Sequence, residues 1–361
     1  MTGPAAVLLS YRLGGDDGVS VESRKWEWAL RTLGFETRRV AGEFDDGLRP
    51  DDTWLGFLAI DPVAGAHVEP DALAAAIAGV DLVVVENLCS LPLNLGAARA
   101  ASEVLSRHRG RVVFHHHDLA WERPELEALT EFPPLRPGSL HVAISDHARR
   151  GLLERGIAAV TIRNAFAADD EPGDRSGTRA GRGFAEGDFV VLQPTRAIPR
   201  KGVARGLCLA EDLAGSLPDR LVRYWLTGPA EDGYGPTLER LIASARVPVS
   251  EGRVPRVADA YAASDLVVVP SSWEGFGNPV VEAMLAGRPV VAGHYPALDE
   301  LRELGLRPLP LDDAAEIDDF VRHPDVDVLD RNRAVAAHEL ALERLPSRLE
   351  AAFGQVGWED W

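Results

Sequence analysis

Short, continuously apolar runs alternate with helical stretches along most of the chain, and this alternation constrains the fold more than any other feature. In the first half the apolar runs are 7–9, 82–85, 112–114, 142–144 and 160–162. In the second half they are 189–193, 223–226, 266–269 and 290–291. Helical patterns, such as 21–33 and 72–78, separate them. Apolar strands joined by helical crossovers are typical of parallel sheets covered by helices on both faces, so the sequence predicts an α/β protein.

A polar, glycine-rich segment at residues 167–187 interrupts this alternation and shows no periodicity. Such a composition is typical of a linker, and a chain of 361 residues is long enough for about two domains. We therefore expect a Rossmann-like domain over 1–170, a linker over 171–187 and a second Rossmann-like domain over 188–335. Ligands of such sheets bind beyond the carboxyl ends of the strands, so two sheets that face each other would form a cleft.

Composition disfavours several classes of protein. The formal net charge of −18 opposes binding to nucleic acid and to anionic membrane surfaces. No apolar run approaches the roughly 20 residues that a membrane-spanning helix needs, and the first ten residues lack the basic start of a signal peptide. The two cysteines, Cys89 and Cys208, have no metal-ligand spacing and fit a reducing compartment. The sequence thus predicts a cytoplasmic protein without a transmembrane segment or a nucleic-acid partner.

The segment that follows the apolar run 266–269 carries the strongest sequence motif. Its loop ends in Asn278, which suits a helix N-cap, and Pro279 suits the first helical position. Gly287 suits the end of that helix. A helix N-terminus attracts anions such as a diphosphate, because its first N–H groups have no partner within the helix. We therefore expect an anionic ligand at the start of this helix.

Two glycines and two glutamates belong to the same segment. Gly275 and Gly277 let the backbone approach a ligand without steric conflict from a side chain. Glu274 lies in the loop and Glu282 within the first turns of the helix, so the two carboxylates can bind different hydroxyl-bearing groups. A surface glutamate beside an ordinary capped helix is the alternative interpretation of this segment.

The stretch EGFGNPVVE resembles the E-x7-E motif of the retaining GT-B glycosyltransferases, in particular glycosyltransferase family 4. The resemblance implies that Glu274 binds the donor sugar and that Glu282 binds the ribose hydroxyls of the nucleotide. It also implies that the backbone between them holds sugar and phosphate, with the residues Gly275, Phe276, Gly277 and Asn278. A metal-independent, retaining transfer of a hexose-type sugar is the activity that this family implies.

Two cations follow the expected strand 189–193. Arg196 offers a planar fork for phosphate oxygens, and Lys201 offers a mobile point charge that could stabilise a departing diphosphate. Their spacing resembles the R-x-x-x-x-K-G element of family 4, in which both cations bind the diphosphate. Arg200 is a further cation without an assigned role. Gly228, in the stretch LTGPAEDGYG, resembles the glycine turn of the donor site.

A glycine-rich turn with Gly14, Gly15 and Gly18 follows the first apolar run and opens a helical pattern. Phosphate groups are often bound where a glycine turn opens a helix, although a plain turn is the alternative. By resemblance to family 4 we expect Gly15 and Gly18 to contribute to the donor site. Which glycine faces the phosphate stays open, because Asp16 and Asp17 lengthen the loop.

Three consecutive histidines, His115, His116 and His117, end the expected strand around 112–114. Strand alternation would send His115 and His117 to one side and His116 to the other. A metal site, a structural histidine cluster and a histidine that contacts sugar hydroxyls are the competing interpretations, and we expect no metal. His117, followed by Asp118, best resembles the strand-end histidine of family 4, while His115 and His116 remain alternatives.

The remaining expectations concern the acceptor and the end of the chain. Asp118, Trp121 and Glu122 are expected to shape the acceptor side, where the face of Trp121 could stack on a sugar ring. Residues 336–361 are expected to form a helix and tail that cross back to the first domain. Trp358 and Trp361 of that tail could pack across the cleft or at a partner surface.

Taken together, the motifs predict an enzyme with catalytic residues Glu274, His117, Arg196 and Lys201. It would transfer a hexose-type sugar from a UDP- or GDP-sugar to an acceptor hydroxyl on a sugar, small molecule or lipid, without a cofactor. The first domain would bind the acceptor and the second the donor nucleotide. An inactive nucleotide-sugar-binding subunit and a GT-B sugar-nucleotide epimerase are the alternatives.

Overall fold

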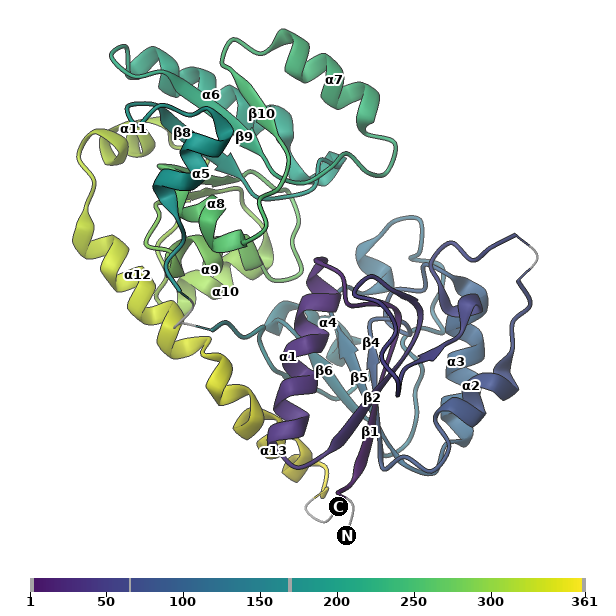
Figure 1. Cartoon of the computed structure of the whole chain (residues 1–361). Coiled ribbons are helices and arrows are strands. Elements are labelled where there is room, and N and C mark those ends of the chain that lie inside the picture. The colour runs from purple at the N-terminus through teal and green to yellow at the C-terminus, as the bar shows by residue number, and fades with distance from the viewer. Residues whose placement is uncertain (1–2, 65, 168–170, 359–361) are drawn as a thin grey trace. The chain divides into compact units, whose positions relative to one another are not determined.

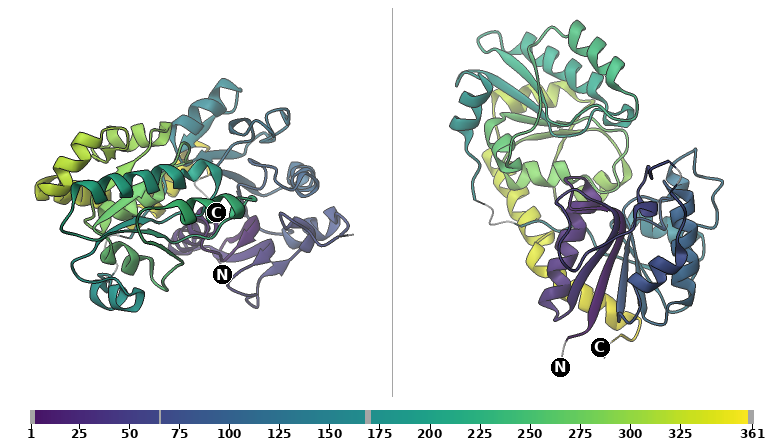
Figure 2. Two further views of the ribbon diagram at one scale, coloured as in Figure 1. Left: turned by 90° about the horizontal axis from the view of Figure 1, so that it is seen from above. Right: turned by 45° about the vertical axis from the view of Figure 1, so that its right-hand side comes forward.

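The computed structural model describes residues 3–64, 66–167 and 171–358, and they form two compact units (Figure 1). Unit 1 holds the described residues of Met1–Ala165 and Leu342–Trp361. Unit 2 is Phe166–Ala341. Each unit contains one sheet in which all strand pairs are parallel, with helices packed on both faces (Figure 2). This arrangement confirms the predicted α/β class.

The sheet of unit 1 has seven strands in the order β3-β2-β1-β4-β5-β6-β7. The strands are β1 (Ala5–Leu13), β2 (Glu36–Phe44), β3 (Thr53–Trp54), β4 (Leu82–Glu86), β5 (Arg111–His116), β6 (Leu140–Ala143) and β7 (Ala159–Thr161). The helices are α1 (Gly18–Thr32), α2 (Pro70–Ala76), α3 (Leu95–Arg107), α4 (Asp146–Glu154) and α13 (Leu345–Gln355), with short 3-10 turns η1 (Gly56–Leu58), η2 (Ala120–Glu122) and η4 (Leu342–Arg344).

Alternate residues of β1 belong to two different cores, one on each face of this sheet. Ala6 and Leu8 pack with Trp26 of α1 and Phe353 of α13, so the last long helix covers the same face as the first (Figure 1). On the other face, Val7 and its neighbours pack with α2 and α3. The continuous apolar pattern of the strand follows from this double burial.

The sheet of unit 2 has six strands in the order β10-β9-β8-β11-β12-β13. The strands are β8 (Phe189–Gln193), β9 (Val222–Leu226), β10 (Val249–Glu251), β11 (Leu266–Val269), β12 (Val290–Ala292) and β13 (Leu309–Pro310). The helices are α5 (Arg175–Arg182), α6 (Val203–Ser216), α7 (Gly235–Ser244), α8 (Val257–Ala263), α9 (Asn278–Leu285), α10 (Pro296–Glu303), α11 (Ala314–Arg322) and α12 (Val326–Glu339), with a 3-10 turn η3 (Pro199–Lys201).

In each sheet the strand order reverses at one point. In unit 1 the reversal lies between β1 and β4, and in unit 2 between β8 and β11. At such a point the connections leave in opposite directions, so the carboxyl ends of the two strands border a crevice where α/β proteins bind ligands. The sequence motifs that follow β8 and β11 therefore lie at the reversal point of unit 2.

Within the segment expected to be a linker, residues 175–182 form helix α5. The helix lacks the apolar periodicity of the others because its buried side chain is Arg179, which is only 1% exposed. This guanidinium donates hydrogen bonds to the carbonyl oxygens of Ala263 and Asp188 at 2.8 and 2.7 Å. A buried arginine thus replaces the leucine or valine that a pattern search requires.

Two further elements add detail to the expectations. Residues 336–361, expected to form a helix and tail, include the end of α12 at Glu339 and helix α13, which begins at Leu345. Strand β2 was not expected, because its first half carries charged side chains and its apolar content is low. Among the described residues, no helix is long and apolar enough to cross a membrane.

Candidate active site

The loop between β11 and α9 brings the strongest sequence motif to the reversal point of unit 2. Helix α9 begins at Asn278, and Gly277 is its N-cap, which corrects the expectation that Asn278 takes the cap position. Gly277 has φ of 104°, and a Cβ added there would lie 2.7 Å from the hydroxyl of Tyr295. Backbone conformation and space both require glycine here, and Gly287 with φ of 66° follows the helix end as expected.

Glu274 is the centre of a buried polar cluster in this loop. Its carboxylate accepts two hydrogen bonds from Nζ of Lys201, at 2.5 and 2.6 Å, and one from Oγ of Ser271 at 2.6 Å. The guanidinium of Arg200 lies 3.6 Å from the same carboxylate and donates to the carbonyl of Trp273 at 2.9 Å. The structure therefore brings Glu274 and Lys201 together, and it adds Arg200, whose role the sequence left open.

The charges of this cluster depend on one another. Burial by itself would raise the pKa of Glu274, but Lys201 and Arg200 outweigh it, so the pKa of this carboxyl lies below its usual value. Burial lowers the pKa of Lys201, and the attraction of Glu274 opposes that shift. An anion that replaced Glu274 beside Lys201 would meet a cation already stripped of water, where electrostatic interactions are strong.

Arg196 lies on the loop after β8, outside this buried cluster. Its guanidinium forms an ion pair with Glu231 at 2.6 Å, and its side chain is 36% exposed. Gly228 lets the two loops meet, because a Cβ there would lie 2.5 Å from the carbonyl oxygen of Thr195. Gly228 thus has a packing role beside Arg196 that accounts for the residue without any ligand.

Glu282 lies on α9 and does not join the Glu274 cluster. Its carboxylate accepts a hydrogen bond of 2.7 Å from the hydroxyl of Tyr261 on α8. Glu282 thus has a hydrogen-bond partner that is not among those of Glu274.

Gln193 is a residue of this site that the sequence reasoning missed. Its side-chain amide donates to the carbonyl oxygen of Lys201 at 3.0 Å and to Oγ1 of Thr195 at 2.9 Å, and it accepts from the hydroxyl of Tyr224. Gln193 thereby fixes the turn that carries Lys201. The signal was a fully buried amide at the end of an otherwise apolar strand.

In the glycine turn of unit 1, an aspartate of the chain itself caps helix α1. Asp17 is the N-cap of α1, and its carboxylate accepts hydrogen bonds from the N–H groups of Val19 and Ser20 at 3.1 Å. Gly18 is the first residue of that helix, and Gly15 accepts a hydrogen bond from Arg24 at its carbonyl oxygen. A carboxylate of the chain itself therefore already occupies the helix N-terminus that was expected to meet phosphate.

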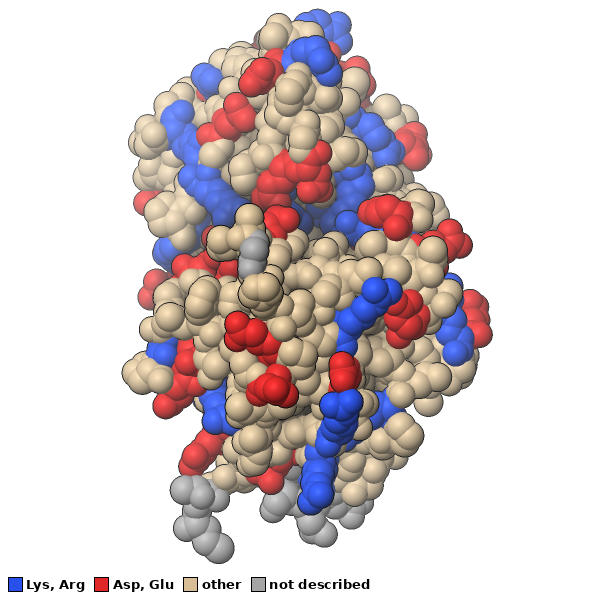
Figure 3. All heavy atoms as spheres, turned by 90° about the vertical axis from the view of Figure 1, so that its right-hand side faces the viewer, with Lys and Arg blue, Asp and Glu red and all other residues tan. Residues whose placement is uncertain are grey.

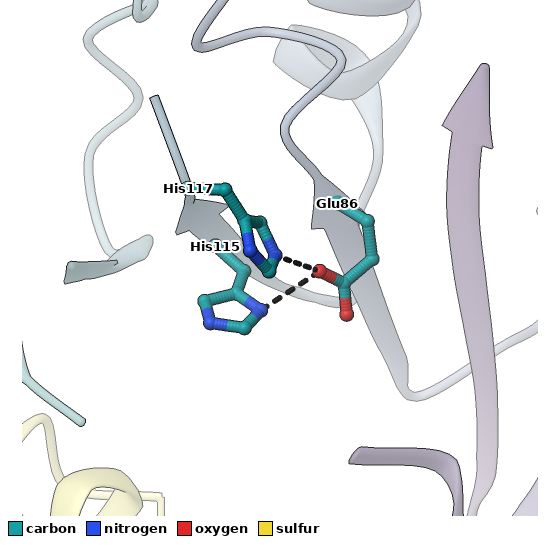
Figure 4. Close-up of side chains that lie close together, drawn as sticks. All are labelled: Glu86, His115 and His117. Atoms are coloured by element: carbon teal, nitrogen blue, oxygen red, sulfur yellow. Dashed lines mark hydrogen bonds and ion pairs between the residues drawn. The ribbon is translucent and has the colours of Figure 1, made fainter. Parts of the chain in front are cut away.

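Two of the three strand-end histidines, His115 and His117, lie around one buried carboxylate (Figure 4). Glu86 ends β4, and its Oε2 is 2.7 Å from Nδ1 of His115 and 2.9 Å from Nε2 of His117. His116 points to the other side of β5, where Ser90 lies 2.6 Å from its Nδ1 and His141 lies 3.0 Å from its Nε2. The predicted alternation of the three histidines is confirmed.

The pKa directions within this cluster follow from burial and from the shared carboxylate. Burial would raise the pKa of Glu86, but His115 and His117 outweigh it and hold this pKa at about 2. For His117, hydrogen bonding to Glu86 overcomes burial and raises the pKa. For His115, burial dominates and the pKa is lowered. Glu86 is therefore ionised and His115 neutral at physiological pH.

The side chains of Glu86, His115 and His117 also form the one candidate metal-ligand group within the described ranges. Their nitrogens lie 2.7 and 2.9 Å from the carboxylate oxygen, which are hydrogen-bond distances. Neighbouring ligands of a tetrahedral ion with bonds of about 2.1 Å would be roughly 3.4 Å apart. The observed distances are those of hydrogen bonds between the three side chains.

Trp121, which the sequence places on the acceptor side, has its ring in contact with other residues of unit 1. The guanidinium of Arg155 lies 3.8 Å from the centre of its ring, and Gly151 of α4 packs against the indole. Asp118 follows His117, and Oδ1 of Asn87 accepts from the N–H groups of both residues at 3.1 Å. Asn87 therefore holds the start of the loop that begins at Asp118.

Glu122 is the third residue expected on the acceptor side. Its carboxylate accepts from the N–H of Leu119 at 3.0 Å, and burial raises its pKa to about 7. Trp358 packs against Phe353 in the core of unit 1, with ring centres 5.9 Å apart, so it is not a cleft or partner residue. Trp361 lies outside the described residues.

An open pocket of about 660 Å³ lies elsewhere in unit 2, between α5 and the segment after β10. Asp174, Arg182 and Glu251 are among its lining residues, whereas Glu274, Lys201 and Glu282 are not. Opposite charges line it without a concentration of either sign. Acidic and basic side chains are likewise interspersed over the face of the molecule in Figure 3. We therefore place the candidate site at the reversal point rather than in this pocket.

Known proteins resemble the chain over most of its length. A family model described as glycosyl transferases group 1 matches residues 196–320. The mannosylglucosylglycerate synthase of Thermotoga maritima is 29% identical, over 85% of this chain and 84% of that protein. The crystal structure of Anabaena HepE in complex with UDP and glucose has a TM-score of 0.75 at 20% identity, covering 98% of this chain and 100% of that one. The sucrose-phosphate synthase of Thermosynechococcus elongatus has a TM-score of 0.74 at 16% identity, covering 98% and 99%.

The solved structures and the two parallel Rossmann-like sheets define the GT-B fold, which confirms the predicted fold class. The match to the glycosyl transferases group 1 covers residues 196–320, which hold the motif from Glu274 to Glu282, in agreement with the resemblance to glycosyltransferase family 4.

Proposed function

We propose that the protein is a retaining, metal-independent hexosyltransferase that takes its sugar from a UDP- or GDP-sugar and transfers it to an acceptor hydroxyl. The observation that carries the proposal is the buried pair of Glu274 and Lys201, with Arg200 beside it, at the reversal point of the unit 2 sheet. A desolvated cation beside a helix N-terminus suits a diphosphate, and a neighbouring carboxylate suits sugar hydroxyls.

In this proposal the donor exchanges partners with the polar cluster. The diphosphate takes the place of Glu274 beside Lys201, whose long side chain can follow it, and Arg196 leaves Glu231 to bind a second phosphate oxygen. The start of α9 supports the same charge through its N–H groups. Glu274 then accepts hydrogen bonds from the sugar, and Glu282 from the ribose. The cations stabilise the charge that grows on the diphosphate as the sugar leaves.

Unit 1 contributes the acceptor side and a histidine. His117 contacts a hydroxyl of the donor sugar, and Asp118 begins the loop that borders the acceptor. The acceptor hydroxyl attacks the anomeric carbon from the face that the phosphate leaves, its proton passes to the departing phosphate, and the anomeric configuration is retained. This stereochemistry rests on the family, and an analysis of product configuration would test it.

The names of similar proteins support a choice of donor and acceptor. The structure of HepE with UDP-glucose supports a UDP-sugar as the first donor to try. The full-length relatives are mannosylglucosylglycerate synthases, and the D-inositol 3-phosphate glycosyltransferase of Rhodococcus erythropolis is 35% identical over 34% of this chain. Both names denote small, polar, hydroxylated compounds. We therefore propose a small hydrophilic acceptor rather than a lipid.

A thermal-shift panel with UDP, GDP, ADP and TDP, each with and without Mg²⁺, tests the donor site. A nucleotide at about 100 times its Kd should add about 2.7 kcal/mol to the free energy of unfolding, and Glu282→Ala should lose that gain. Sugar release from the matching donor, with and without small acceptors, then tests transfer. Conversion of the donor without any acceptor would indicate an epimerase, and binding without turnover an inactive subunit.

A further inference from the structure

Glu86 is a buried carboxylate to which the reaction assigns no role. It ends β4 beside β5, where it is paired in register with His115, and it is 0% exposed. One of its oxygens accepts from both His115 and His117. A buried charge without compensation is costly, so a fixed arrangement of both imidazoles around Glu86 is strongly favoured.

The chemistry of Glu86 determines where the histidine protons lie. An ionised carboxylate only accepts hydrogen bonds, so each nitrogen that faces it must carry a hydrogen. His117 therefore keeps a hydrogen on Nε2, and its Nδ1 remains for another partner. Among the described residues, none hydrogen-bonds to this Nδ1, and 5% of the side chain is exposed. A ligand hydroxyl is the kind of group that this nitrogen can bind.

The surroundings keep the His117 ring from turning over. The ring of His115 stacks on Trp26 with centres 4.1 Å apart, and it lies 4.3 Å from the ring of His117. Asn87 fixes the backbone of His117 through its N–H at 3.1 Å. A flipped His117 ring would turn its Nε2–H away from a carboxylate that has no access to water.

We propose that Glu86 is a positioning residue, which holds Nε2–H of His117 so that Nδ1 is presented to a hydroxyl of the donor sugar. The inference deepens the proposed function and rests on it where it names the sugar. Neutral His117 would accept a hydrogen bond from that hydroxyl at Nδ1, and protonated His117 would donate one. Glu86 thereby also sets the pH at which this nitrogen changes from donor to acceptor.

The groups that face His117 are Glu86, His115, Asp118 and, at longer range, Glu22. Of these, Glu86 alone hydrogen-bonds the ring, so replacing it should shift the titration of His117 more than any other change. Glu86→Gln keeps size and shape but removes the charge. We expect the inflection that His117 sets in the pH profile of kcat/KM to move about one unit toward acid, with kcat/KM at pH 7 reduced about tenfold.

Ser90→Ala is the matched control, because Ser90 bonds His116 on the opposite side of the same strand. We expect this variant to keep the wild-type pH profile and kcat/KM. If Ser90→Ala and Glu86→Gln shift the profile equally, Glu86 acts only through the stability of β5 and the proposal is overturned. The proposal is equally overturned if Glu86→Gln leaves the profile in place.

A spectroscopic readout separates this inference from the proposed function. Nitrogen-15 NMR of histidine-labelled protein, with His117→Gln to assign the signals, reports the tautomer without any turnover. We expect a single Nε2–H form in the wild type and a mixture in Glu86→Gln. Identical His117 signals in the two proteins would overturn the positioning role even if transfer is observed. A wild type that binds no sugar nucleotide would instead overturn the proposed function and leave the tautomer result intact.

Discussion

Glu274 in unit 2 and Glu86 in unit 1 are both buried carboxylates beside the point where the order of their sheet reverses. Glu274 is held by the flexible amine of Lys201 and by a serine three residues away. Glu86 is held by two imidazoles, one of them stacked on Trp26. The first arrangement can exchange partners with a ligand because a lysine side chain moves easily. The second is fixed by packing, so it suits orientation rather than exchange.

Removing the charge of Lys201 should have the largest effect on activity. Lys201→Met keeps the length of the side chain but leaves Glu274 without its closest partner and the diphosphate without a buried cation. We expect kcat/KM for the donor to fall by about 10²- to 10³-fold, measured by release of the nucleoside diphosphate. Arg205→Met, which removes an exposed cation of α6 from its pair with Asp312, is the control. Comparable losses in both variants would contradict the assignment.

Lowering the pH should reduce the stability that ionised Glu86 contributes. The pKa of Glu86 is lowered from 4.5 to about 2, so its contribution to stability is complete above about pH 5 and disappears as the pH falls through 2. This shift corresponds to about 3 kcal/mol in total. Between pH 6 and pH 3, the free energy of unfolding measured with denaturant should therefore fall more steeply with decreasing pH in the wild type than in Glu86→Gln. Equal pH slopes would mean that Glu86 is not ionised in its pair.

Substituting one serine in each cluster compares the strength of their hydrogen bonds. Ser271 donates to ionised Glu274 at 2.6 Å, whereas Ser90 bonds an imidazole that burial keeps neutral. Hydrogen bonds to charged groups are the stronger, so we expect Ser271→Ala to cost about 2 kcal/mol of unfolding free energy and Ser90→Ala about 1 kcal/mol. Chemical denaturation of both variants at pH 7 measures the difference. The reverse order would show that the two clusters do not differ in charge as described.

The smallest effect is expected at the exposed pair of Arg196 and Glu231. Both side chains are more than a third exposed, so water screens their charges. We expect Arg196→Ala to raise KM for the donor about tenfold, because one phosphate contact is lost. Glu231→Gln should leave KM unchanged or lower it a few-fold, since Arg196 no longer has to leave a partner. A higher KM in Glu231→Gln would indicate that this glutamate, rather than the arginine, meets the substrate.

The sequence predicted the two halves of the molecule unequally well. The loop of Glu274 and the helix of Glu282 are contiguous, so the glycines and carboxylates could be located from spacing alone, and the cap to within one residue. The parallel sheets were predictable because doubly buried strands are continuously apolar. Alternation also assigned the opposite directions of His115 and His116 on β5.

The features that the sequence did not predict depend mostly on contacts between side chains, many of them far apart in the sequence. Glu86 lies 29 residues before His115, and nothing in the run that precedes it distinguishes a histidine partner from a surface glutamate. Helix α5 escaped detection because Arg179 fills an apolar position, and the sequence did not reveal that Asp17 caps α1. Buried charged side chains that hydrogen-bond to each other do not follow the apolar periodicity from which buried positions are predicted.

The placement of α13 has a consequence for how the polypeptide is made. Leu349 and Phe353 of this helix complete the hydrophobic core around Trp26, although more than 300 residues separate them from α1 in the chain. During synthesis, all the strands of unit 2 leave the ribosome before that core can close. The first unit to be translated is therefore the last to be finished, and until then Trp26 and Leu30 present an apolar face that chaperones would recognise.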